Sequence, residues 1–177
     1  MNRELVLRRR IKRFTGLFVV GLVLSGATAI PLEMEMNWLV RFTGAQPLVA
    51  APGPAPAPDW AQWLVRVQGA IQDTATRHPF MAYGTDWLAF GHFVIALAFI
   101  GALRDPVRNA WLYTFGILAC GLVIPYALVF GAMRGIPLWW RCIDCSFGVF
   151  GLIPLGLCRR WLRQLPSMNE SPPRSIQ

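Results

Sequence analysis

Four long apolar runs, each nearly free of charge, constrain this sequence more than any other feature. They cover about residues 14–32, 86–103, 110–133 and 138–158. The first has no charged side chain from Phe14 to Leu32, which corresponds to about 28 Å of helix. Helices of that length cross the hydrocarbon core of a bilayer. The sequence therefore predicts an all-α integral membrane protein, a four-helix bundle forming a single membrane domain over residues 1–177.

The composition agrees with a membrane protein and argues against a nucleic-acid partner. Charged residues make up 15% of the chain and the mean hydropathy is +0.43, whereas about a quarter of a soluble domain is charged. The formal net charge is +8, but the basic residues cluster beside the apolar runs. That placement favours anchoring at the surface of a lipid bilayer over a phosphate-binding face.

The distribution of basic residues predicts the orientation. Twelve of the 17 Arg and Lys residues lie in the two tails and in the link between the second and third runs, and five lie elsewhere. Since cytoplasmic segments carry an excess of basic residues, both termini are predicted to be cytoplasmic. The long segment of residues 33–85 and the short link near residue 135 are then external.

The first run also has features of a cleavable secretory signal. It follows a basic tail and contains Ala27-Thr28-Ala29, which resembles a cleavage site. However, the apolar run continues through Ile30 and Pro31 to Leu32, and so reaches spanning length. We therefore favour an uncleaved anchor.

The external segment has two predicted parts. Ala51–Pro58, "APGPAPAP", alternates proline with small residues and predicts an extended spacer. Asp59 is a candidate N-cap for a helix over about residues 60–77, and Tyr83–Asp86 supplies a turn and cap for the second span. The apolar positions of the helix suit the membrane–water interface, although a helix that caps the bundle is an alternative. These positions are Trp60, Trp63, Leu64, Val67 and Ile71.

Four polar side chains are candidates for a ligand-binding site. His92, Tyr126, Arg141 and Asp144 are expected at similar depths below the outer surface, on three spans. Ionisable groups inside a membrane are costly unless paired or hydrated, so they often mark functional sites. The i, i+3 spacing predicts an Arg141–Asp144 ion pair that faces a ligand headgroup. A hydrogen-bond network that only fixes packing is the alternative, and we favour it for His92 alone.

Cys142 and Cys145 form a Cys-x-x-Cys at the start of the fourth run. The motif resembles that of quinone-coupled thiol oxidoreductases such as the vitamin K epoxide reductase family, which implies a quinone cofactor. Those enzymes need a second, external cysteine pair, whereas the other cysteines here are Cys120 in mid-span and Cys158 at the cytoplasmic end. Asp144 also disfavours a thiolate beside it. We therefore favour an ionic site over a redox centre.

Two segments, "AYGTDWLAFGH" (Ala82 to His92) and "GIPLWWRCIDCSFGVFGLIPL" (Gly135 to Leu155), resemble a family of small bacterial multi-pass membrane proteins of unassigned activity. The resemblance covers about residues 38–158 and implies a bacterial inner-membrane location. A weaker similarity is to the VanZ-like family, in which an Asp and a His start one helix and an Arg-x-x-Asp followed by glycines lies in a later one. It implies a role at the cell envelope, linked to glycopeptide resistance.

The sequence favours a non-catalytic envelope or accessory protein. We expect it to bind a lipid-like ligand or a membrane partner, either another membrane protein or a second copy, through the outer polar positions. No metal site and no cofactor is predicted. The competing class is an enzyme, either a quinone-linked thiol oxidoreductase or one that acts on a lipid-linked substrate.

Overall fold

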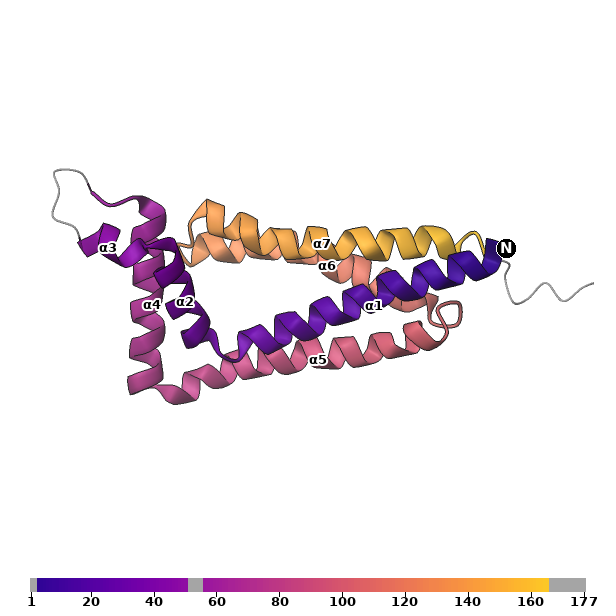
Figure 1. Cartoon of the computed structure of the whole chain (residues 1–177), viewed down its shortest axis with the longest axis horizontal. Helices are drawn as coiled ribbons and strands as arrows, with labels where there is room; N and C mark the ends of the chain where they lie inside the picture. Colours follow the sequence, from indigo (N-terminus) through magenta and orange to yellow (C-terminus); the bar gives the residue numbers. More distant parts are fainter. Residues whose placement is uncertain (1–2, 51–55, 166–177) are drawn as a thin grey trace, which may run out of the picture. The chain divides into compact units, whose positions relative to one another are not determined.

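The structure is a computed structural model that describes residues 3–50 and 56–165, which contain helices and no strand. Four helical segments are long and apolar enough to cross a membrane: Arg3–Ala29, Pro79–Arg104, Ala110–Met133 and Leu138–Leu162. This confirms the all-α class and the four spanning-length helices. In chain order (Figure 1) the elements are α1 (Arg3–Ala29), α2 (Leu32–Thr43), α3 (Ala45–Ala50), α4 (Asp59–Arg77), the 3₁₀ helix η1 (Pro79–Ala82), α5 (Tyr83–Arg104), α6 (Ala110–Met133) and α7 (Leu138–Leu162).

The apolar side chains of the long helices mostly lie on the surface. In α6 only 11% of the most apolar stretch is buried, and Leu118 and Leu122 are 62% and 67% exposed. Apolar surface of this extent is unfavourable in water. The arrangement suits helices that are surrounded by lipid.

The chain forms two compact units, and each has its own packing. The first consists of Met1–Gly21 and Ala96–Gln177, and the second of Leu22–Ile95. In the first unit, α6 and α7 form a helical hairpin. Its turn uses Gly135, whose φ of 69° lies in the left-handed region that glycine favours. The Ile136 amide donates to the Gly131 carbonyl oxygen at 2.9 Å.

Glycines allow α6 and α7 to approach each other closely. A Cβ on Gly148 would lie 2.5 Å from the carbonyl oxygen of Cys120. A Cβ on Gly116 would lie 2.7 Å from a methyl carbon of Leu155. Small residues at such crossings strengthen helix packing in membranes, where the hydrophobic effect does not drive association.

The first half of α1 completes the core of this unit. Phe14 packs edge-on against Trp161 of α7 with ring centroids 5.2 Å apart, and Phe18 lies 4.9 Å from Phe99 of α5. Ile11 and Phe99 are fully buried. The end of α1 that carries the N-terminus therefore lies beside the end of α7 that carries Trp161.

The second unit contains a smaller core where α2 and α3 pack on α4. Its buried apolar side chains are Met36, Val40, Ala45, Ala61 and Leu64. Polar contacts border this core, since Gln68 and Gln72 of α4 both donate to the Asn37 side-chain oxygen of α2, at 2.8 and 3.0 Å. Gly44, with a φ of 65°, ends α2 in the left-handed conformation that glycine favours.

The bounds of two spans differ from the sequence-based expectation. α1 begins at Arg3, so the basic tail is helical, and it ends at Ala29, just before Pro31. α7 continues to Leu162 with Arg159 and Arg160 in its last turn, because long arginine side chains can extend a membrane helix into the headgroup region. The predicted bounds of α6 are unchanged, at Ala110–Met133.

The segment of residues 33–85 is more helical than predicted. α2 and α3 precede the proline-rich spacer, of which residues 51–55 lie outside the described part and 56–58 have no regular structure. Asp59 is not an N-cap, since it is the first helical residue after Pro58 and no side-chain cap bond forms there. Likewise Tyr83–Asp86 forms the first turn of α5, directly after η1, instead of a separate turn.

Candidate functional site

Polar side chains lie beside the turn between α6 and α7, at one end of the first unit, which we call the hairpin end (Arg141, Cys142, Asp144 and Cys145). Arg141 is in the first turn of α7, where its amide donates to the Pro137 carbonyl oxygen at 3.1 Å. Its side chain lies across α6, because Gly131 leaves room for it. A Cβ on Gly131 would be 2.5 Å from Cδ of Arg141 and 2.7 Å from Cγ.

Only some of the hydrogen-bond donors of the Arg141 guanidinium have a partner in this position. Nη1 donates to the Leu128 carbonyl oxygen at 3.0 Å, whereas the buried Nε has no hydrogen-bond partner. A positive charge near the carboxyl-terminal turns of α6 is favoured by the helix dipole. The N–H groups of the two terminal nitrogens that do not bond to Leu128 can still donate to a ligand.

Asp144 does not form the expected ion pair with Arg141. Among residues 3–50 and 56–165 the ion pairs are Arg8–Glu4 and Arg77–Asp73. The predicted ion pair is wrong, because the Arg141 side chain extends to α6 instead of along α7. Asp144 is half-buried, and within the same described ranges its carboxylate has no hydrogen bond. It lies one turn before Gly148, on the side of α7 that approaches α6 lower in the helix.

The structure does not bring Tyr126 to Arg141. Tyr126 is 66% exposed, and its ring stacks on Phe130 of the same helix with centroids 4.5 Å apart. The α6 residues that contact the Arg141 side chain are Leu128 and Gly131. By helical periodicity Tyr126 lies on the opposite face of α6.

His92 belongs to the second unit and bonds within its own helix. Its Nδ1 donates to the Leu88 carbonyl oxygen, one turn earlier in α5, at 2.8 Å. Its Cβ also lies near Gly26 of α1, where an added Cβ would be 3.0 Å away. These contacts are those of a residue that helps two helices to pack.

The two cysteines of the Cys-x-x-Cys have different surroundings. Cys142 is exposed and Cys145 is half-buried, and both are free thiols. The Cys145 thiol is 3.8 Å from the Ile124 carbonyl oxygen of α6, as a weak donor. In the described part of the chain no group of three or more His, Cys, Asp or Glu side chains could hold a metal ion.

A buried polar cluster at the opposite end of the unit was not predicted from the sequence. The hydroxyl of Thr15 donates to the Ile11 carbonyl oxygen at 2.8 Å and lies 2.7 Å from the Tyr113 hydroxyl. The Cys158 thiol is 3.6 Å from the same Ile11 oxygen. We call Thr15, Tyr113 and Cys158, which are 0% exposed, the Thr15 cluster. The only sequence signal is that each interrupts an apolar run with a hydrogen-bonding group.

Comparisons of the chain with known protein families, with curated proteins and with solved structures found no match.

Proposed function

We propose that the protein is a multi-pass protein of a bacterial inner membrane, with both termini in the cytoplasm and the hairpin end facing outward. The four spanning-length helices support its membrane location. The excess of basic residues in the tails and the α5–α6 link supports the orientation. A reporter fused after Met133 should then report the periplasm, and one fused after Asp105 the cytoplasm. The reverse pattern would refute the orientation.

We also propose that α4 lies in the outer membrane–water interface. Trp60 is 37% exposed, and Val67 and Ile71 are half-buried, so this side of α4 remains available to lipid while Leu64 packs inside the second unit. Tryptophan and aliphatic side chains suit that boundary. Brominated lipids should quench the fluorescence of a variant that retains only Trp60 and Trp63, and quenching by aqueous iodide alone would contradict the proposal.

The function that the geometry supports best is the binding of a lipid-like ligand at the hairpin end, in an accessory role without catalysis. The observation that carries it is that Arg141 and Asp144 lie one turn apart without neutralising each other. Unpaired charges near a membrane are unfavourable, so a ligand that pairs with both would bind favourably. A zwitterionic headgroup, such as phosphatidylethanolamine, has one group for each.

The chemistry assigns a role to each side chain. The Asp144 carboxylate accepts hydrogen bonds from the ammonium group of the headgroup. The N–H groups of the two terminal nitrogens of Arg141 that do not bond to Leu128 bind the phosphate, as guanidinium groups often do.

Native mass spectrometry of the full-length protein, released from vesicles of phosphatidylethanolamine, phosphatidylglycerol and phosphatidylcholine, tests the proposal. The wild type should retain phosphatidylethanolamine above its share in the vesicles. Asp144→Asn should lose that enrichment, because the neutral amide does not pair with the ammonium group. The matched control is Glu35→Gln, which neutralises an exposed carboxylate of α2. Equal retention by the wild type and Asp144→Asn would contradict lipid binding here and favour a protein partner.

A further inference from the structure

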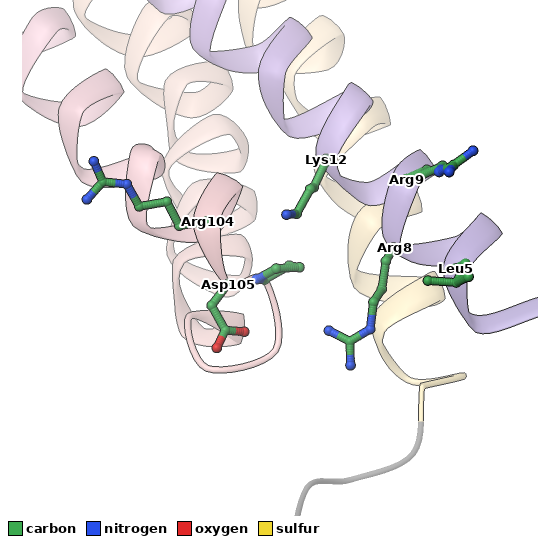
Figure 2. A pocket seen from close by; sticks show the side chains of 7 residues that line it. Leu5, Arg8, Arg9, Lys12, Arg104 and Asp105 are labelled. Carbon is green, nitrogen blue, oxygen red and sulfur yellow. The ribbon is translucent and has the colours of Figure 1, made fainter.

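A second polar site lies at the opposite end of the first unit. A cavity of about 380 Å³ is bordered by the first turns of α1 and by the end of α5 with its following turn. Its lining residues are Leu5, Arg8, Arg9, Lys12, Arg104, Asp105 and Pro106. Four of the seven are basic and one is acidic. We call this cavity the basic pocket (Figure 2).

Two cations extend into the space between the two chain segments. Figure 2 shows Arg8 and Lys12 reaching from α1 toward the turn at Asp105, whereas the head of Arg9 points away. Arg8 uses its Nε for Glu4, at 2.8 Å, which leaves its terminal nitrogens for a ligand. Lys12 takes part in no ion pair within the described ranges.

The carboxylate of Asp105 is engaged by the backbone. Its Oδ1 accepts hydrogen bonds from the amides of Val107 and Arg108, both at 3.1 Å. The turn therefore offsets part of its negative charge. The pocket keeps an excess of positive charge, which attracts anions.

The pocket also lies where lipid headgroups would be. Leu5 lines it and is 54% exposed, which gives the site an apolar border. One turn or so deeper, Phe14 packs on Trp161, and tryptophan is typical of the membrane interface. Basic pockets between membrane helices bind the headgroups of anionic lipids on the side where such lipids are abundant.

Basic residues that only set the orientation of α1 in the membrane would not need to line a cavity together with the end of α5. Arg10 and Arg13 belong to the same helix and are exposed, yet they do not line the cavity. The lining joins residues about a hundred positions apart in the sequence. We propose that the basic pocket binds the phosphate group of an anionic phospholipid, through Arg8 and Lys12, independently of the hairpin end.

The test measures the binding of labelled phosphatidylglycerol to the full-length protein in phosphatidylcholine mixed micelles. The paired substitution Arg8→Gln with Lys12→Gln should weaken binding by about 25-fold, at about fivefold for each charge removed. Arg10→Gln with Arg13→Gln is the matched control, because it removes the same charge from the same helix. It should weaken binding less than threefold, and an equal loss in the two pairs would overturn the pocket in favour of general surface attraction.

Two further binding measurements test whether the site depends on charge and on the lipid chains. Lys12→Arg keeps the charge and should retain binding within about threefold, so a loss as large as that of the glutamine pair would contradict a charge-based site. Inorganic phosphate at millimolar concentration should not displace the labelled lipid, because it lacks the acyl chains. Complete displacement by phosphate would show a site for a water-soluble phosphate and would overturn the lipid assignment.

Discussion

At one end of the first compact unit, the polar groups of Thr15, Tyr113 and Cys158 satisfy one another and an Ile11 carbonyl oxygen. At the hairpin end, Arg141 uses one nitrogen for a carbonyl oxygen of α6, and Asp144 has no partner among the described residues. The first group is neutral and fully buried. The second is ionic and partly exposed.

The difference separates two uses of polar residues among apolar helices. Neutral groups that complete their own hydrogen bonds hold helices together, and nothing remains for a ligand. Charged groups that do not complete theirs raise the energy of the protein until something else pairs with them. We infer that the Thr15 cluster stabilises the fold and that the hairpin end binds.

The largest expected effect is at the contact between α6 and α7, on which both the hairpin end and the Thr15 cluster depend. Gly148→Ala would place a Cβ 2.5 Å from a backbone oxygen of Cys120, so α6 and α7 must separate. We expect the free energy of unfolding to fall by about 1–3 kcal/mol. Unfolding in mixed micelles measures it. Gly156→Ala in the same helix, with nothing within 4 Å, is the control, and equal stability of the two variants would contradict the packing described.

A smaller effect is expected at the Thr15 cluster. Tyr113→Phe removes the hydroxyl that lies 2.7 Å from Thr15 and should cost about 1 kcal/mol in the free energy of unfolding. Tyr126→Phe makes the same chemical change at an exposed position and should stay within about 0.5 kcal/mol. If the two variants unfold alike, the cluster does not stabilise the fold.

The thiols should contribute least at the hairpin end. Replacing Cys142 and Cys145 together by Ser should leave phosphatidylethanolamine retention unchanged, and each change should cost at most about 0.5 kcal/mol, because Cys142 is exposed and Cys145 makes one weak contact. Alkylation trapping in membranes is the second measurement. Cycling of the two thiols between disulfide and dithiol with the quinone pool would contradict this and support the oxidoreductase alternative.

The spans were predictable because bilayer thickness dictates their length and apolar composition. The bounds of α6 agree with the prediction, whereas α1 and α7 extend into their basic flanks. The helices α2 and α3 were missed. α2 has 12 residues and α3 has six, and both pack against α4. Contacts between distant segments stabilise such helices more than their own composition does.

The partners of the site residues were not predictable from spacing. Spacing along α7 predicts that Arg141 meets Asp144, but the room for its side chain is left by Gly131 in another helix. The exposure of Tyr126 depends on the rotation of α6 about its axis, and the Thr15 cluster depends on the contact of three helices. A single sequence does not specify these rotations.

Asp144 has no counter-charge among residues 3–50 and 56–165, which leaves its carboxylate available to a ligand. The most direct test is the free energy of unfolding of Asp144→Asn, measured beside that of Tyr113→Phe in detergent micelles that contain no lipid. We predict that Asp144→Asn does not lower it, because no pair is lost and an unpaired charge is removed, while Tyr113→Phe lowers it by about 1 kcal/mol. A loss of about 3–5 kcal/mol in Asp144→Asn, as expected when a buried ion pair is broken, would contradict the claim.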